Sequence, residues 1–337
     1  HLPNIAESWM YDNVKGDIKI EELYAEYDLI NNHIIENSIQ GKAQIKDAKI
    51  RFHKDVDAVN TKSLDIFFKD NRLHFNLMEP MFKDKKLDGS FVLINNLTSE
   101  KNGQVDVFLK TNSKLDKDIL DILKAYNITL PIIQKNGNTQ ASLLMKFPYD
   151  TTKNMSTYGE FFLNDAKVAI NNFEFESKNA EVILDDSIIK IKNSDFKYKD
   201  MINATLNLNL DIKTLKSYGD ANIKSFLIKE ENKESLVEIK DKNTAIDLNF
   251  NNEVSILLKD LGTNIKISDL IYVNIDDLSK IYPYSKLLKD NSIKEGIVAL
   301  QIKDEKNINF EAFIKGLNLP LQKNDTNIDS LEINGKI

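Results

Sequence analysis

The sequence contains no cysteine, few glycines and prolines, and no long hydrophobic run. Its 337 residues include 11 Gly and 6 Pro, too few for a collagen-like or low-complexity chain. Without cysteine there are no disulfides, zinc–thiolate sites or cysteine nucleophile, but the compartment stays open, since an oxidising compartment permits disulfides without requiring them. No run of 18 or more apolar residues occurs and no signal peptide is visible, so this sequence is not expected to span a membrane.

The sequence also has little excess of one charge sign over the other. The 45 Lys and Arg and the 52 Asp and Glu are mixed along the whole chain and give a net charge of −7. No basic stripe suited to nucleic acid stands out. The apolar content of 42% is too high for a disordered chain and predicts a folded protein with a sizeable core.

The main signal is an alternation of apolar and polar residues with period two, as in residues 64–68, 73–77 and 206–212. Such alternation places the apolar side chains on one face of a strand. Short polar segments such as Lys69-Asp70-Asn71 separate the runs and are typical of hairpin turns. The sequence therefore predicts a mainly β protein made of antiparallel meanders, with one face in water.

A few short amphipathic helices interrupt this pattern. The spacing of the apolar residues predicts a helix over 114–127 with Ser113 as its N-cap. A second helix is predicted over 276–282, ended by Pro283, and a third helical turn over 4–13.

Two blocks of sequence resemble each other. Residues 41–50 (GKAQIKDAKI) and 159–168 (GEFFLNDAKV) share the glycine and the Asp-Ala-Lys-aliphatic core. Such repetition indicates units that bury their apolar face only with a neighbour. We predict a helix and strand lead-in at 1–38, a first meander repeat at 39–154, a second at 155–262, and a partial third at 263–337. Because strand alternation continues to Ile337 and the first residue is His1 rather than Met, we expect a fragment of a longer protein, truncated at its C-terminus.

The residues alone leave two destinations for the apolar face. The sheet could pack on a second sheet as a filled sandwich, or it could curl into an incompletely closed groove that meets an apolar ligand. Periodicity does not separate these alternatives.

The repeated block resembles the sheet of AsmA-like bacterial envelope proteins, particularly the YhdP-type branch. Residues 137–148 (GNTQASLLMKFP) also resemble a strand ending in Phe-Pro that recurs in that family, and the resemblance covers residues 39–215. It implies an elongated, curled antiparallel β-sheet that forms a groove from repeated meanders. Members of the family are bridge-like lipid-transfer proteins, anchored in the inner membrane, and are implicated in moving phospholipids toward the outer membrane.

The function expected from this resemblance is a periplasmic β-groove that binds phospholipid acyl chains and conducts lipids between the inner and outer membranes, in outer-membrane biogenesis. Its partners would be phospholipids or other acyl lipids, a membrane reached through an anchor outside this sequence, and unknown proteins at the membranes, but no nucleic acid. The alternative is a structural or adhesive envelope scaffold of β-repeats with a filled core.

The groove would be lined by alternating apolar residues of the predicted strands. The candidates are Ile45, Leu64, Ile66, Phe68, Leu73, Phe75, Leu77, Phe91, Leu93, Val105, Val107, Leu109, Phe161, Leu163, Val182, Leu184, Ile189, Ile191, Leu206, Leu208, Leu210, Leu248, Phe250, Ile256 and Leu258.

No catalytic constellation accompanies this pattern. The four histidines are scattered without metal-ligand spacing, and His74 is expected on the polar face. The paired acids Asp185-Asp186 and Asp276-Asp277 fit a turn and a helix start. We therefore expect no enzyme activity, no cofactor and no metal.

Overall fold

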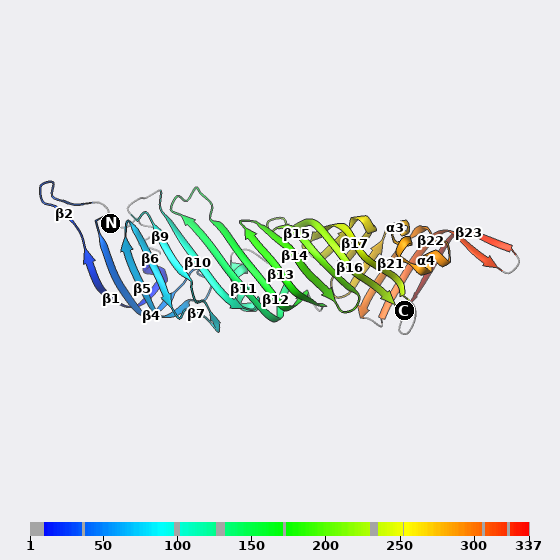
Figure 1. Ribbon diagram of the computed structural model, residues 1–337, viewed down its shortest axis with the longest axis horizontal. Coiled ribbons are helices and arrows are strands. Elements are labelled where there is room, and N and C mark those ends of the chain that lie inside the picture. The colour runs from blue at the N-terminus through cyan, green and yellow to red at the C-terminus, as the bar shows by residue number, and fades with distance from the viewer. Residues whose placement is uncertain are drawn as a thin grey trace. The chain divides into compact units, whose positions relative to one another are not determined.

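The computed structural model describes residues 10–35, 38–97, 102–125, 132–170, 173–229, 235–251, 253–304, 307–321 and 324–336. Over these residues the protein is mainly β, with 21 strands in one antiparallel sheet that does not close and a separate two-stranded hairpin (Figure 1). The chain forms two compact units. Unit 1 contains His1–Thr129, Asn138–Phe162 and Ile183–Asp186, and unit 2 contains Leu130–Gly137, Leu163–Val182 and Ser187–Ile337.

Unit 1 contains the first meander, a helical turn at residues 10–13 and a helix after the meander. Its strands are β1 (Val14–Tyr24), β4 (Gln40–Ile50), β5 (Val59–Lys69), β6 (Arg72–Met78), β7 (Met81–Phe82), β8 (Lys85–Lys86), β9 (Phe91–Asn95) and β10 (Gln104–Ser113). Strands β2 (Tyr27–Asp28) and β3 (His33–Ile34) form the separate hairpin, and α2 (Lys117–Ala125) follows β10. The pairing order is β1–β4–β5–β6–β9–β10, and β10 then pairs with β11 (Ile132–Pro148).

Unit 2 contains a longer meander in which consecutive strands pair. Strands β12 (Ser156–Ile170) and β13 (Phe173–Asp185) contain residues of both units and continue the strand order. They are followed by β14 (Ile188–Tyr198), β15 (Ile202–Asp211), β16 (Lys216–Lys229), β17 (Ser235–Asn249), β18 (Val254–Leu258), β19 (Thr263–Ile267), β20 (Ile271–Ile275), β21 (Glu295–Asp304), β22 (Asn307–Leu321) and β23 (Asn324–Lys336). The helical segments are η1 (Lys259–Leu261), α3 (Leu278–Ile281), η2 (Tyr282–Tyr284) and α4 (Lys286–Asp290).

The predicted class, antiparallel meanders with a few short helices, is confirmed. The β5–β6 turn is of the expected kind, because Asp70 and Asn71 have φ angles of 52° and 57°, the left-handed conformation that suits a two-residue hairpin. Helices α2 and α3 lie within the predicted ranges, whereas α4 was not predicted. Of the helical turn predicted over 4–13, residues 10–13 are helical and residues 4–9 lie outside the described residues.

The prediction of Ser113 as the cap of the first helix was wrong. Ser113 ends strand β10, where it pairs with Thr139. The carboxylate of Asp116 instead accepts hydrogen bonds from the backbone N–H groups of Asp118 and Ile119, at 3.1 and 3.4 Å. Aspartate is as good an N-cap as serine, so composition alone could not choose between two candidates three residues apart.

The repeated Asp-Ala-Lys block has the same backbone conformation in both copies, and in the first copy it forms a β-bulge, because Asp47 and Ala48 of β4 lie opposite a single residue of β1. Asp47 and Asp165 have φ angles of 47° and 44°, and the alanine that follows each of them is buried. A glycine on a neighbouring segment lies close to each alanine: Gly16 to Ala48 in unit 1, and Gly137 to Ala166 in unit 2. Aspartate tolerates the left-handed conformation, and there is room for only a methyl group beside the glycine. The bulge at Asp47 bends β4 and increases its twist.

We expect Gly137→Ala to destabilise the protein more than Gly316→Ala. Both glycines have left-handed φ angles, +81° and +65°, so each substitution costs about 1 kcal/mol of backbone strain. At position 137 the new Cβ would also lie 2.6 Å from the carbonyl oxygen of Asp165, whereas nothing lies within 4 Å at position 316. This contact should add about 2 kcal/mol. Urea denaturation measures the difference, and equal losses would contradict the close approach.

Candidate functional site

The inner face of unit 1, meaning the sheet face that carries its buried apolar residues, is built from rows of side chains paired across adjacent strands. One row contains Ile20, Ala43, Ile66, Phe75, Val92, Val107 and Met145. The next contains Leu23, Gly41, Phe68, Leu73, Ile94, Val105 and Phe147. Residues directly opposite each other in an antiparallel pair share a face, so each row presents one apolar strip across the strands.

The middle of this inner face is packed by protein. Leu64 and Ile94 have no exposed surface, and Phe75 is 1% exposed. The same buried cluster includes Phe82 of β7 and Leu87, which follows β8. The central residues therefore have protein neighbours on all sides.

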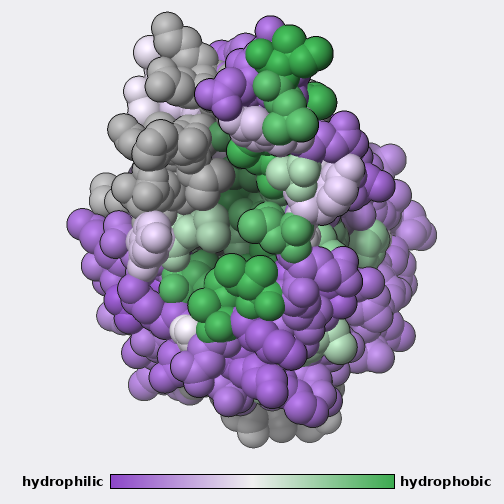
Figure 2. Space-filling model, turned by 90° about the vertical axis from the view of Figure 1, so that its left-hand side faces the viewer, coloured by the Kyte–Doolittle hydropathy of each residue, from purple (hydrophilic) through white to green (hydrophobic). Residues whose placement is uncertain are grey.

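At strand β1 the same inner face is open. Ile18, Ile20 and Leu23 pair with residues of β4 on the inner face, yet all three are exposed. Figure 2 looks onto this end of the chain and shows hydrophobic side chains gathered in a hollow, with hydrophilic surface around them. The apolar rows thus reach solvent at β1.

The inner face of unit 2 carries two longer rows over ten strands. The first contains Ile191, Leu208, Gly219, Ile246, Leu258, Thr263, Ile275, Val298, Ala312 and Ile333. The second contains Ile189, Leu210, Ser217, Leu248, Ile256, Ile265, Val273, Leu300, Phe310 and Gly335. In the second row Ile256, Ile265, Leu300 and Phe310 are only half-buried, so apolar surface remains accessible there.

A helical segment covers part of the unit 2 inner face. Helix α3 contacts β21, while η2 and α4 contact β17. Their residues Leu278, Ile281 and Leu288 are buried in the same cluster as the strand residues. Asp277 and Ser285 cap the two helices, since their side chains accept hydrogen bonds from the backbone N–H groups of Ser279 and Leu288. Between β20 and β21 the chain thus supplies its own apolar cover.

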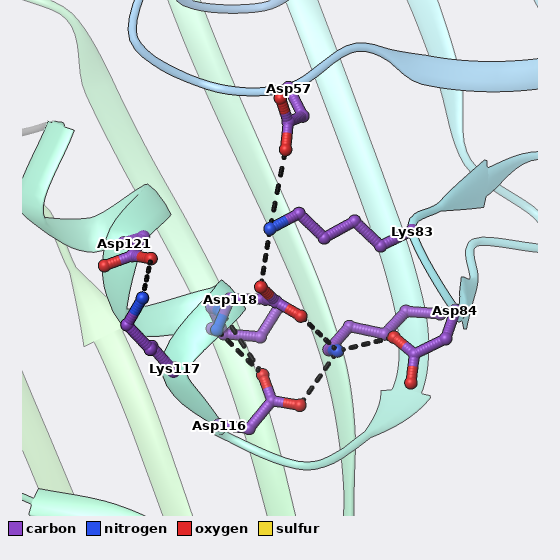
Figure 3. Close-up of polar contacts among 9 residues, drawn as sticks. Asp57, Lys83, Asp84, Asp116, Lys117, Asp118 and Asp121 are labelled. Carbon is purple, nitrogen blue, oxygen red and sulfur yellow. Dashed lines mark hydrogen bonds and ion pairs between the residues drawn. The ribbon is translucent and has the colours of Figure 1, made fainter.

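A group of ion pairs, here called the Lys85 cluster, ties helix α2 to the rest of unit 1 (Figure 3). Its members are Asp57, Lys83, Asp84, Lys85, Asp116 and Asp118. The ammonium of Lys85, whose side chain is 4% exposed, lies 2.9 Å from carboxylate oxygens of Asp84 and Asp116 and 3.5 Å from one of Asp118. Lys83 joins Asp118 to Asp57 of the loop between β4 and β5, at 3.4 Å from Asp57. The cluster therefore connects a loop, the β7–β8 hairpin and the first turn of α2.

Four members of the Lys85 cluster have pKa values shifted in favour of their charged forms: Lys83, Asp84, Lys85 and Asp118. Burial by itself would lower the pKa of Lys85, but hydrogen bonds to Asp116 and Asp84 outweigh it and raise that pKa above its ordinary value. The hydrogen bond from Lys83 lowers the pKa of Asp118. Since α2 has no fully buried residue, these ion pairs hold the start of the helix in place. This arrangement suits an anchoring role.

An open cleft of about 890 Å³ lies beside the Lys85 cluster. Its lining includes four lysines, four acidic residues and no histidine. Within the described residues, no three acidic or histidine side chains are grouped so that they could hold a metal ion.

Most of the predicted lining residues lie on the inner faces. In unit 1 these are Ile45, Leu64, Ile66, Phe68, Leu73, Phe75, Leu77, Val105, Val107 and Leu109. In unit 2 they are Ile189, Ile191, Leu206, Leu208, Leu210, Leu248, Ile256 and Leu258. Phe250 packs against the unit 2 core, and Phe161, Leu163, Val182 and Leu184 are half-buried on β12 and β13. Contact of any of these residues with lipid stays a prediction.

The placement of Phe91 and Leu93 on the inner face was wrong. They pair with Asn76 and His74 on the opposite face, where the ring of Phe91 stacks on that of Phe108 at 5.1 Å. Val92 and Ile94 take the inner positions. Residues 91–94 are all apolar, so the strand has no alternation that could show which of its side chains lie on the inner face. Only the register with β6 decides this.

Some inner-face residues were missing from the predicted lining. Ile18 and Ile20 of β1 continue the unit 1 rows, and Ile265, Leu300 and Phe310 continue those of unit 2. Alternation with polar residues was a sufficient signal for four of them, whereas Leu300 follows Ala299.

A family model described as YhdP protein matches residues 8–291. No match was found among curated proteins or among solved structures. In the part of the chain that the structure describes, no helix has both the length and the apolar character needed to cross a membrane.

We expect Lys85→Met to loosen α2 and to cost about 2 kcal/mol of stability. The change leaves the carboxylates of Asp84, Asp116 and Asp118 without their buried cation, a loss moderated by the partial exposure of these acids. Lys117→Met is the matched control on the same helix, because Lys117 pairs with Asp121 at 3.6 Å but is 85% exposed, and its removal should change little. Urea denaturation compares the two. Equal effects would contradict an anchoring role for the Lys85 cluster.

Proposed function

The chain belongs to the YhdP protein family, an AsmA-like family, and from this premise we propose that it is a lipid-binding groove of the periplasm. In this proposal the inner faces bind phospholipid acyl chains and conduct lipids between the inner and outer membranes. No step is catalytic. An anchor outside this sequence attaches the protein to the inner membrane.

The observation that carries the proposal is an uninterrupted apolar row in unit 2. From β17 to β22, six consecutive strands contribute Leu248, Ile256, Ile265, Val273, Leu300 and Phe310 to one row, and most of these side chains keep accessible surface. At about 4.8 Å per strand, the row extends for about 24 Å. A lipid tail that spans half of a hydrocarbon core of about 30 Å needs about 15 Å. Each buried CH₂ group contributes about 0.8 kcal/mol, with little dependence on the head group.

A structural scaffold is the second candidate, and the packing of unit 1 favours it. Fully buried residues such as Leu64 and Phe75 leave no room for a ligand at the middle of that inner face. A scaffold would use the sheet for its stability and its edges for contacts with other envelope proteins.

Native mass spectrometry of gently purified protein tests the proposal directly. We expect co-purifying phospholipid, because acyl chains are more stable against half-buried apolar rows than in water. The folded state is checked by circular dichroism on the same sample. Folded protein free of lipid, which also fails to take up added phospholipid, would leave the scaffold as the better explanation.

Two adjacent residues of β18 separate the inner face from the outer one. Ile256 is half-buried on the inner face, whereas Leu257 pairs with Asp247 on the opposite face and is exposed. We expect Ile256→Gln to reduce uptake of a fluorescent phospholipid several-fold, because it places an amide in the apolar row. Leu257→Gln should leave uptake unchanged. Equal uptake by the two variants, both folded by circular dichroism, would contradict binding on the inner face.

A further inference from the structure

The β2–β3 hairpin presents two aliphatic side chains to solvent at its tip. Leu29 is 87% exposed and Ile30 is 93% exposed, more than any other large hydrophobic side chain of the described residues. The hairpin forms its own two-stranded sheet, and Figure 1 shows it projecting beyond β1. Neither side chain belongs to the buried core of unit 1.

Several polar groups of the tip form hydrogen bonds within the hairpin. The carboxylate of Asp28 accepts hydrogen bonds from the backbone N–H groups of Ile30 at 2.8 Å and Asn31 at 3.0 Å, and from the side-chain amide of Asn31 at 2.7 Å. The hydroxyl of Tyr27 donates a hydrogen bond to Asn32. When backbone N–H groups of a turn are already hydrogen-bonded, moving the turn out of water costs less free energy.

The surroundings of the tip are those of a segment that enters a lipid interface. Tyr24 and Tyr27 precede it on β1 and β2, and both are about half exposed. Tyrosine rings favour the boundary between hydrocarbon and water. On β1, Ile20 and Leu23 continue the exposed apolar surface from the inner face of unit 1 toward the hairpin. Figure 2 shows hydrophobic side chains above the hollow as well as within it.

The size and charge of the hairpin indicate its partner. Strands of two residues offer too little area for a stable protein interface, which needs about 800 Å² from each partner. Insertion into a bilayer requires only a few apolar side chains. The acidic residues Glu26 and Asp28 would be repelled by anionic lipid. We propose that the β2–β3 hairpin docks on a zwitterionic phospholipid bilayer by inserting Leu29 and Ile30, whether or not the inner faces bind lipid.

Flotation with phosphatidylcholine vesicles tests this docking. In the double variant Leu29→Ser/Ile30→Ser the vesicle-bound fraction should decrease at least fivefold. The variant should stay folded because both side chains are exposed. The matched control is Leu287→Ser/Ile297→Ser, which removes the same two residue types from exposed positions of unit 2 and should bind as the unmodified protein does. Replacing part of the phosphatidylcholine with phosphatidylglycerol should weaken binding.

The cysteine-free chain allows a second measurement at the tip itself. A single Leu29→Cys variant labelled with an environment-sensitive dye should shift to the blue on addition of vesicles, and Ile297→Cys labelled in the same way should not. No flotation of the unmodified protein, or equal losses in the two double variants, would overturn the proposal. A smaller oligomer for Leu29→Ser/Ile30→Ser without vesicles would assign the tip to a second copy of the chain instead. Native mass spectrometry distinguishes failure of this docking from failure of the proposed function. The hairpin variant should still carry bound phospholipid even though it no longer binds vesicles.

Discussion

Strand register is the constraint on which the structure depends. Every strand must present its apolar side chains to the same face, because a slip of one residue would move a whole set into water. The paired rows show how this is achieved, with branched and aromatic side chains opposite each other on strand after strand. The bulge at Asp47 allows an extra residue without reversing the face, since the buried Ala48 resumes the inner side.

The two units cover their apolar faces by different means. In unit 1, large side chains such as Phe82 and Leu87 join the core, and the buried ammonium of Lys85 fixes the neighbouring loop, hairpin and helix. In unit 2, short capped helices contribute a few leucine and isoleucine side chains and leave part of one row accessible. The first arrangement favours a rigid core, and the second leaves surface that an apolar ligand could share. Within one family fold, the choice of inserts between strands thus sets how much apolar surface remains available.

Much of the fold could be predicted from local pattern, and the failures share a cause. Alternation located most strands and most inner-face residues, and the polar pair Asp70-Asn71 identified a hairpin turn. Phe91 and Leu93 were misplaced because their strand is apolar on both sides, so a neighbouring strand had to decide. The Lys85 cluster could not be predicted at all, since it brings Asp57 and Asp118 together from distant parts of the chain. Patterns within a strand reveal its face, but they do not reveal which distant charges meet.

Pairing between consecutive strands has a consequence for folding and for evolution. From β14 to β23 each strand pairs with the next one along the chain, so contacts between strands are short-range in sequence. Such a chain can nucleate at one hairpin and grow by adding the next, with little loop-closure entropy at each stage. An added or deleted pair of strands would disturb only its immediate neighbours. Duplication of hairpins could therefore change the number of strands in descendants of this protein while each remaining strand keeps its own partners.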